Sequence, residues 1–232
     1  MIEPDADGEI CTVTIDRPDA RNALPWEGLD ELEAAIVDAT EPIVYLEGTG
    51  PAFCAGADLD VVAELDGPEA RRFAERGQAV ATAIEESSSI VVAGIDGPAR
   101  GGGLELALAC DLRVATPEAT FSEPGVTFGL FGAWGGTVRL PRVLGEGDAL
   151  ELALSGRVVD AEEALRMGLI SRIEDDPRTV ATELADNAAD ALSVLKRRLR
   201  DDGDRKRQER REAEAFADLV VAHAEELAAL RE

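Results

Sequence analysis

The chain has 232 residues, 45% of them apolar, which is enough for one large domain or for one domain with an appendage. Its 48 acidic and 23 basic residues give a formal net charge of −25. This charge argues against binding to nucleic acids and to anionic membranes, because an acidic surface repels phosphates. No apolar run approaches the ~20 residues of a membrane span, and the acidic N-terminus lacks the basic-then-apolar order of a signal peptide.

The basic residues are nearly all arginine, since only Lys196 and Lys206 are lysines. Excess carboxylate with scarce lysine is typical of proteins that work in concentrated salt, where self-repulsion is screened. We expect a halophilic protein, with an ordinary acidic protein from a GC-rich genome as the alternative. Three scattered cysteines, Cys11, Cys54 and Cys110, provide neither a disulfide framework nor a zinc spacing, so the expected location is the reducing cytoplasm.

Strands and helices are predicted to alternate along the first half of the chain, which favours an α/β architecture with several parallel connections. Alternating or short apolar runs predict strands at residues 10–15, 43–46, 90–95 and 112–115. Helical spacing of apolar residues, or an Ala-rich composition, predicts helices at residues 25–37, 68–86 and 104–109. The apolar face of the first predicted helix is made of Leu29, Leu32, Ile36 and Val37.

From Pro177 onward the chain is predicted to be helical. Two apolar stripes at helical spacing are separated by an acidic, glycine-containing loop at residues 201–204. We therefore expect an α/β core of residues 1–177 and a C-terminal helical region of residues 178–232. His223 falls on the apolar side of the second stripe, where a packed histidine is the simplest interpretation.

Two glycine-containing turns follow predicted strands and precede predicted helices. In residues 51–59 (PAFCAGADL), small residues and Gly56 let the backbone approach a ligand and present a free N–H, although a plain strand-to-helix turn is equally consistent. In residues 97–105 (GPARGGGLE), three successive glycines open a helix whose N–H groups and dipole suit an anion or a developing oxyanion. That segment matches neither a Walker loop nor GxGxxG, so a phosphate site is disfavoured.

Two further features can carry chemistry. Glu105 lies in the first turn of an otherwise apolar helix, where it either complements the helix dipole or, if burial raises its pKa, serves as an acid or base. Between residues 121 and 137, glycines lie next to Phe128, Phe131 and Trp134. This pattern is typical of a pocket wall, and core packing explains the aromatic residues equally well.

Six segments, taken in chain order, resemble the crotonase, or enoyl-CoA hydratase/isomerase, family and cover most of residues 10–173. They are DRPDARNAL (16–24), PAFCAGADL (51–59), GPARGGGLELALACDLRVAT (97–116), FSEPGVTFGL (121–130), GGTVRLPRVLG (135–145) and GRVVDAEEALRMGLI (156–170). The resemblance implies a crotonase-like spiral of ββα units whose C-terminal helices join subunits or cover an active site, usually in homotrimers or homohexamers. It implies an acyl-CoA substrate, with coenzyme A entering as part of that substrate, and no metal or nicotinamide cofactor.

In this family, two backbone N–H groups from separate loops receive the thioester oxygen of an acyl-CoA and stabilise its enolate. By position these are the N–H groups of Ala57 and Gly102. Hydratases add two glutamates that flank the reacting water. The first matches Glu105, and the second matches Gly125, which has no side chain. Glu123 lies two residues earlier and would face the same side of an extended segment.

The resemblance also implies which residues bind the substrate. Arg21 is the candidate for the phosphates of coenzyme A, or else an ordinary surface arginine, because the basic residue that many relatives carry is Pro51 here. The other expected contacts come from the two loops and from the glycine-rich aromatic segment. They are Ala55, Gly56, Asp58, Gly101, Gly125, Val126, Phe128, Phe131 and Trp134.

The leading hypothesis is an enoyl-CoA hydratase that converts a 2-enoyl-CoA and water into a 3-hydroxyacyl-CoA, with Glu105 as acid and base. The glycine at position 125 keeps two alternatives open. One is an isomerase that converts a 3-enoyl-CoA into a 2-enoyl-CoA with Glu105 alone. The other is a weakly active or non-catalytic paralogue that binds acyl-CoA.

Overall fold

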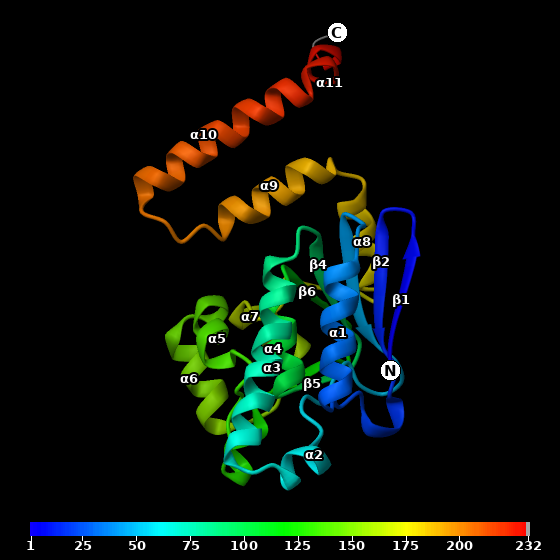
Figure 1. The fold of residues 1–232 in the computed structure, drawn as a ribbon, viewed down its shortest axis with the longest axis vertical. Helices are drawn as coiled ribbons and strands as arrows, with labels where there is room; N and C mark the ends of the chain where they lie inside the picture. The colour runs from blue at the N-terminus through cyan, green and yellow to red at the C-terminus, as the bar shows by residue number, and fades with distance from the viewer. Residues whose placement is uncertain (231–232) are drawn as a thin grey trace. The chain divides into compact units, whose positions relative to one another are not determined.

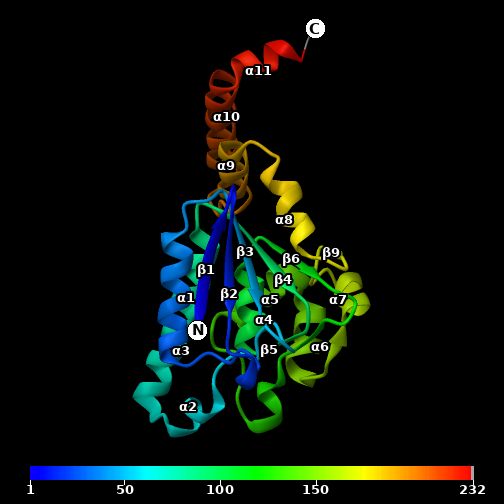
Figure 2. The ribbon, with the colours of Figure 1, turned by 90° about the vertical axis from the view of Figure 1, so that its right-hand side faces the viewer.

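The computed structural model describes residues 1–230 of the chain. It divides into two compact units, residues 1–184 and a C-terminal unit that begins at Ala185. Figure 1 shows the N-terminal unit as a layer of strands with helices packed against it, and Figure 2 shows β1, β2 and β3 next to one another. In the described part of the chain, no helix combines the length and the apolar composition that crossing a membrane requires.

A six-stranded sheet forms the centre of the N-terminal unit, with the strand order β1-β2-β3-β4-β6-β9. Its strands are β1 (Ile2–Asp7), β2 (Ile10–Ile15), β3 (Ile43–Gly48), β4 (Ile90–Ile95), β6 (Leu112–Ala115) and β9 (Arg172–Ile173). All neighbours run parallel except β1 and β2, which are antiparallel. The four predicted strands and the predicted parallel connections are therefore confirmed.

The sequence pattern does not predict β1, because its residues (IEPDAD) are mostly acidic and exposed. The strand pairs with β2 in register from Ile2 opposite Ile15 to Asp7 opposite Ile10. Gly8 makes the turn between them with φ +62°. Backbone hydrogen bonds thus hold this edge strand in place, and its charged side chains discourage pairing with another chain.

Helices α1 (Trp26–Asp38) and α3 (Gly67–Glu86) lie side by side in the N-terminal unit (Figure 1). The rings of Trp26 and Phe73 join them edge to face, with centroids 4.9 Å apart. Both predicted helices are confirmed. The predicted apolar face of α1 is buried at Leu29, Leu32 and Ile36.

A three-stranded sheet brings two loops of the chain to the same edge. Its strands are β5 (Pro98–Arg100), β7 (Thr120–Ser122) and β8 (Val159–Asp160). Because β5 and β7 run parallel, Gly101 and Glu123 both leave the sheet at this edge, and Gly101 N donates to Ser122 O at 3.0 Å. Strand β5 leads into α4 (Gly102–Ala109), which is buried at every position, as the sequence predicts.

The remaining elements are mostly short helices. In the N-terminal unit they are η1 (Pro18–Ala20), α2 (Leu59–Glu64), η2 (Pro124–Phe128), α5 (Gly136–Leu144), α6 (Glu146–Ser155), α7 (Ala161–Met167) and α8 (Arg178–Ala185), which ends at the boundary. The C-terminal unit contains α9 (Ala189–Leu199), α10 (Arg205–Ala222) and α11 (Ala224–Ala229). The predicted α/β architecture with C-terminal helices is thus confirmed, including the loop between residues 201 and 204.

Two sequence-based interpretations of single residues are wrong. Val37 is 65% exposed, because it follows the buried Ile36 by about 100° around the helix and so faces away from the core. His223 does not pack among apolar side chains. Its Nε2 lies 2.9 Å from Oδ2 of Asp190, and the side chain is about one-third exposed.

Candidate active site

The two loops that contain the predicted N–H donors lie side by side. A parallel β-bridge joins Cys54 to Ala99. Cys54 N donates to Pro98 O at 3.3 Å, and Arg100 N donates to Cys54 O at 3.0 Å. The buried Cys54 thiol donates to Asn22 O at 3.1 Å, and burial raises its pKa to about 12. This cysteine is therefore a structural thiol that holds the first loop in place.

Gly56 allows the first loop to touch the second. Its φ is +88°, and a Cβ at this position would lie 2.7 Å from Gly102 N and 2.7 Å from Arg100 O. A side chain here would push the loops apart, and the positive φ disfavours one as well. Because of this close approach, the neighbouring residue Ala57 lies next to the start of α4.

Ala57 and Gly102 each carry an N–H group that has no acceptor among residues 1–230. Leu24 N donates to Gly56 O at 2.8 Å, and Asp58 N donates to Leu24 O at 3.1 Å. Leu24 thus bonds the residues on either side of Ala57, whose own N–H points the other way. Gly102 is the first residue of α4, where N–H groups lack intrahelical acceptors and the helix dipole is positive.

Both residues line one cavity of about 300 Å³. Its walls come from the two loops, from α2 and α3, and from the segment that follows β7. The only ionisable side chains in the described lining are the carboxyls of Glu105 and Glu123. The lining residues are Ala55, Ala57, Leu59, Val62, Leu65, Ala70, Phe73, Ala74, Gly101, Gly102, Glu105, Glu123, Pro124, Gly125, Phe128, Leu130, Phe131, Gly132, Ala133 and Trp134. An apolar cavity with a few convergent polar groups is the usual form of a small-molecule site.

Glu105 is buried in the first turn of α4, and its carboxylate reaches the N-terminus of α5. Its Oε1 accepts hydrogen bonds from Trp134 N at 2.9 Å and from Gly136 N at 2.6 Å. Burial raises the pKa of Glu105, whereas these two bonds and the charge of Arg139 oppose the rise. The fold therefore fixes Oε1, and Oε2, which accepts no hydrogen bond from the described residues, is available to a ligand.

Glu123 lies beside Glu105 without such support. Only 6% of this residue is exposed, and neither carboxyl oxygen has a hydrogen-bond partner in the part of the chain that the structure describes. Burial, reinforced by the negative charge of Glu105, raises the pKa of Glu123 to about 8. The Glu123 carboxyl is therefore mainly protonated at pH 7, as expected of a buried acid that has no cation beside it.

Gly132 lies between the two carboxyl groups. A Cβ at this position would be 2.8 Å from Glu105 Cδ and 2.8 Å from Glu123 Oε2. The two acids thus approach one point from different sides. A glycine leaves this point open, whereas any side chain would displace one acid or the other.

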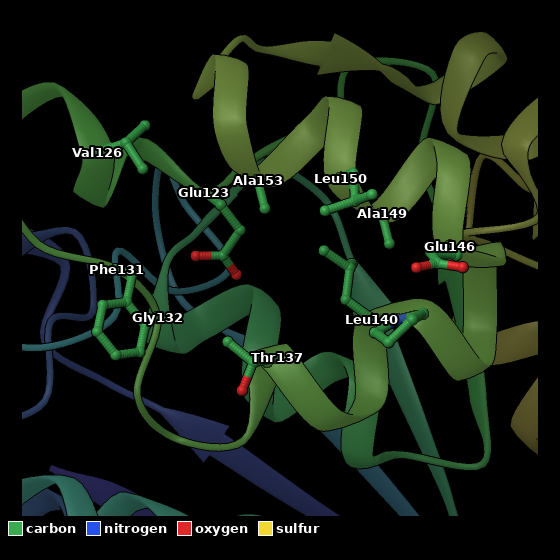
Figure 3. A pocket seen from close by; sticks show the side chains of 12 residues that line it. Glu123, Val126, Phe131, Gly132, Thr137, Leu140, Glu146, Ala149, Leu150 and Ala153 are labelled. Carbon is green, nitrogen blue, oxygen red and sulfur yellow. The ribbon is translucent and has the colours of Figure 1, made fainter.

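A second cavity, of about 440 Å³, adjoins the first one (Figure 3). Glu123, Phe131 and Gly132 line both cavities. Figure 3 shows the Glu123 carboxyl pointing into the second cavity, with Glu146 on its other side. The rest of the lining is largely apolar and consists of Val126, Gly136, Thr137, Leu140, Pro141, Ala149, Leu150 and Ala153.

Most of the residues that sequence analysis assigns to the site come together. Those in the lining of the first cavity are Ala55, Ala57, Gly101, Gly102, Glu105, Gly125, Phe128, Phe131 and Trp134, and Val126 lines the second. The Trp134 ring covers the start of α4, because a Cβ at Gly102 would be 2.4 Å from Trp134 Cε3. A Cβ at Gly125 would be 2.9 Å from Phe131 Cα. The position of the missing glutamate is therefore closed to a side chain.

Three of the assigned residues lie outside the cavity linings. Gly56 brings the loops together, and Asp58 caps α2 and forms an ion pair with Arg17 at 2.5 Å. Arg21 has φ +51°, and its carbonyl accepts a hydrogen bond from Ala55 N at 2.9 Å. Gly56 and Asp58 therefore position the loop, whereas Arg21 contacts the loop through its backbone carbonyl and is exposed.

Sequence reasoning misses the cavity wall that α2 and α3 provide. Leu59, Val62, Phe73 and Ala74 belong to this wall. The available signal is an apolar residue every three or four positions after the PAFCAGAD motif. Leu59 is nevertheless 58% exposed, and periodicity alone does not distinguish a cavity wall from a core face.

Comparisons with known proteins identify the family of this chain. The sequence matches the family model described as enoyl-CoA hydratase/isomerase over residues 5–226. The chain belongs to the enoyl-CoA hydratase/isomerase family. A crystal structure of an enoyl-CoA hydratase from Bacillus anthracis matches this enoyl-CoA hydratase/isomerase fold with a TM-score of 0.92 and 30% identity, over 99% of this chain and 95% of that chain. The structure of Pseudomonas aeruginosa DspI matches with a TM-score of 0.86 and 33% identity, over 95% and 96% of the two chains.

Two curated relatives share its sequence at similar levels. A short-chain-enoyl-CoA hydratase of Clostridium acetobutylicum is 35% identical over 201 residues, which cover 82% of this chain and 77% of the relative. A crotonyl-CoA hydratase of Syntrophomonas wolfei is 38% identical over 170 residues, which cover 71% of this chain and 65% of the relative. The chain is thus similar to hydratases of this family.

Proposed function

We propose that this family member stabilises the enolate of an acyl-CoA thioester and hydrates a 2-enoyl-CoA to a 3-hydroxyacyl-CoA. Two observations support the proposal: neither the Ala57 nor the Gly102 N–H group has an acceptor among residues 1–230, and both residues line a cavity that Glu105 also lines. The hydratase names of the two curated relatives support the same reaction class.

The two N–H groups would hold the thioester oxygen. When water adds to the β-carbon, the π electrons move toward this oxygen, and donors fixed in advance by the fold stabilise the negative charge. Each donor of this kind contributes about 3–4 kcal/mol to the transition state in enzymes where one has been removed. The positive end of the α4 dipole acts in the same direction.

Glu105 would act as the base toward water. Because Oε1 is held by the backbone N–H groups of Trp134 and Gly136, the carboxylate has a defined orientation. Oε2 accepts one proton from a water molecule as the water oxygen attacks the β-carbon. The phosphates of coenzyme A would remain outside the cavity, where the exposed Arg21 provides a positive charge near the loop.

A second candidate function is the isomerisation of a 3-enoyl-CoA to a 2-enoyl-CoA. The observation that favours it is the closed position at Gly125, which rules out a glutamate there without rearrangement. In this reaction, Glu105 alone removes a proton from the α-carbon and returns it to the γ-carbon. The same pair of N–H groups would stabilise the dienolate.

Activity assays with two substrates separate these functions. The protein is purified in molar KCl and given crotonyl-CoA or, separately, a 3-enoyl-CoA, while the absorbance of the conjugated thioester is followed. We expect crotonyl-CoA to be hydrated, and Glu105→Gln to reduce this rate by about 1,000-fold. The matched control is Glu118→Gln, which removes an exposed carboxylate that lines neither cavity. Conversion of the 3-enoyl substrate alone supports the isomerase, and binding without any turnover supports a non-catalytic paralogue.

We also propose that the C-terminal unit joins subunits in a homotrimer or homohexamer. Its helices expose large apolar side chains to solvent: Leu199 is 78% exposed, Phe216 67% and Val221 78%. A second copy of the chain that covers them would remove this surface from water. Light scattering is expected to give a trimer or hexamer for the unmodified protein and a smaller species for Phe216→Glu. A monomer at micromolar concentration would contradict the proposal.

We further propose that the protein is adapted to concentrated salt. The support is its composition, with 48 acidic residues against 23 basic ones. Screening of this self-repulsion would stabilise the folded state. The melting temperature is therefore expected to rise from low to molar KCl, and equal stability at both concentrations would argue against the adaptation.

A further inference from the structure

We propose that Glu123 is a second catalytic residue, the general acid that gives a proton to the α-carbon of the substrate. This assignment rests on the proposed acyl-CoA function. It replaces the glutamate that the family motif would place at position 125, where the backbone of Phe131 closes the space. Glu123 is two positions earlier and reaches the site from the end of β7.

The position of Glu123 follows from the pairing of β5 with β7. These parallel strands bring Gly101 and Glu123 to the same edge, so Glu123 leaves the sheet next to the start of α4. From there its carboxyl meets the point beside Gly132 that the Glu105 carboxyl also approaches. Glu123 therefore lines the cavity that Ala57 and Gly102 also line.

The missing hydrogen-bond partners of Glu123 point to a ligand. A buried carboxyl normally bonds with protein groups or water, since an unpaired one costs free energy. Neither oxygen of Glu123 has a partner among the described residues, although both are buried. In Figure 3 the carboxyl end of Glu123 lies toward the second cavity, although neighbouring atoms cover both of its oxygens almost completely. Because Glu123 lines both cavities, a substrate bound there would lie next to this group.

The surroundings of the two acids give them different roles. Two backbone N–H groups stabilise the ionised form of Glu105, which suits a base. Glu123 has no such donors in the described part of the chain and is mainly protonated near pH 7, which suits an acid. Pairs of carboxyls whose environments separate their pKa values in this way divide the acid and base roles between them.

The charged groups around Glu123 leave it without a compensating cation. In the described part of the chain, Glu105 faces it from α4, and Glu146 of α6 lines the same cavity. Arg139 of α5 is engaged by Glu85, with its Nε and Nη2 donating to Oε2 at 2.9 and 2.6 Å. The proton of Glu123 is therefore retained until a reaction intermediate takes it.

Besides the substrate, the proposed reaction needs only the two acids and one water molecule to account for every proton and electron pair. The water oxygen forms a bond to the β-carbon, Glu105 takes one water proton, and the π electrons move to the thioester oxygen. The resulting enolate forms a C–H bond at the α-carbon with the proton of Glu123, and the electrons return from the oxygen. A proton transfer from Glu105 to Glu123, across the point beside Gly132, restores both acids.

The test compares Glu123→Gln with Glu118→Gln, because Glu118 is an exposed glutamate just before β7 that lines neither cavity. Two rates are measured for each protein in molar KCl: hydration of crotonyl-CoA, and uptake of deuterium at the α-carbon of butyryl-CoA in D₂O. In the second reaction ionised Glu123 removes the α-proton, by microscopic reversibility. We expect Glu123→Gln to lose about 100-fold or more in both rates, with KM within about threefold, and Glu118→Gln to retain both.

The melting temperature of Glu123→Gln should equal or exceed that of the unmodified protein, which excludes unfolding as the cause. Unchanged hydration in Glu123→Gln, with Glu105→Gln inactive, would overturn the assignment and leave the proposed function intact. Loss of hydration with normal deuterium uptake would also overturn it, because Glu123 would then not act at the α-carbon. Deuterium uptake that requires Glu123, in a protein that does not hydrate crotonyl-CoA, would support the assignment and reject hydration. Absence of both reactions in the unmodified protein would contradict both proposals.

Discussion

Glu105 of α4 and Glu123 at the end of β7 bring their carboxyl groups to the same point, but their surroundings differ. Glu105 accepts two backbone hydrogen bonds at the N-terminus of α5. Glu123 is also buried and accepts none from the residues that the structure describes. The fold thus supplies hydrogen-bond donors to Glu105 but not to Glu123. We infer that a bound substrate provides the missing partner of Glu123.

The first prediction concerns the folding free energy that burial of the Glu123 carboxyl costs. Its pKa is raised from 4.5 to about 8, so its contribution to folding stability is fully present below about pH 4.5 and is lost as the pH rises to about 8. Glutamine does not titrate. Glu123→Gln should therefore gain stability relative to the unmodified protein by about 3 kcal/mol between pH 5 and pH 8.

Urea denaturation at both pH values, in molar KCl, measures this difference. The control is Glu146→Gln, whose carboxylate is exposed. A pH dependence that is identical in Glu123→Gln and in the unmodified protein would show that the Glu123 carboxyl is not held in an unfavourable environment.

The next effect concerns the support of Glu105. A Cβ at Gly136 would be 2.7 Å from Glu105 Oε1, so Gly136→Ala should displace the carboxylate from its hydrogen bonds. We expect kcat for hydration to fall by about 100-fold, because a base must be positioned to act. Gly147→Ala in α6 is the control, since nothing lies within 4 Å of its added methyl group. Equal kcat values in the two variants would disprove the positioning role.

Restoring a glutamate at position 125 tests whether the chain has room for the family's second acid. The added side chain would meet the backbone of Leu130 and Phe131. Gly125→Glu should therefore lose about 2 kcal/mol of stability, as overpacked sites do, and gain no hydration activity. Thermal unfolding and the crotonyl-CoA assay measure the two quantities. A faster enzyme of unchanged stability would indicate that position 125, rather than Glu123, is the natural place for the acid.

The last prediction concerns the space between the Glu105 and Glu123 carboxyls, where Gly132 lies. In Gly132→Ala the new methyl group would contact both carboxyls, whose flexible side chains can move aside. We expect hydration to fall about tenfold, with the apparent pKa values of the rate profile shifted as the acids separate. Gly67→Ala, at an open position in α3, should leave the profile unchanged. An unaltered profile in Gly132→Ala would mean that the two acids act independently.

The sequence predicts the features of the site that are local. The glycine run before α4 and the small residues around Gly56 indicate close backbone approach and free N–H groups, and the structure shows both. The burial of Glu105 follows from the apolar residues of its helix. The resemblance to the family assigns these local motifs to one reaction, which composition and periodicity alone do not do.

The environment of Glu123 could not be predicted, because it depends on contacts distant in sequence. Its place beside Glu105 requires the pairing of β5 with β7, about twenty residues apart, and the open point beside Gly132. The closure of position 125 depends on the turn at Leu130 and Phe131. Patterns of hydrophobicity likewise do not predict an acidic edge strand such as β1, because backbone hydrogen bonds to β2 hold this strand in place.

The central claim is that the N–H groups of Ala57 and Gly102 converge on one carbonyl oxygen. Infrared spectroscopy of a bound acyl-CoA with a ¹³C-labelled thioester carbonyl measures this directly, because two fixed donors polarise the C=O bond. The carbonyl stretch is expected at a lower frequency in the bound thioester than in water, and Gly56→Ala, which separates the loops, is expected to abolish most of this shift. A bound carbonyl that absorbs at its frequency in water would show that the two N–H groups do not hold the thioester oxygen.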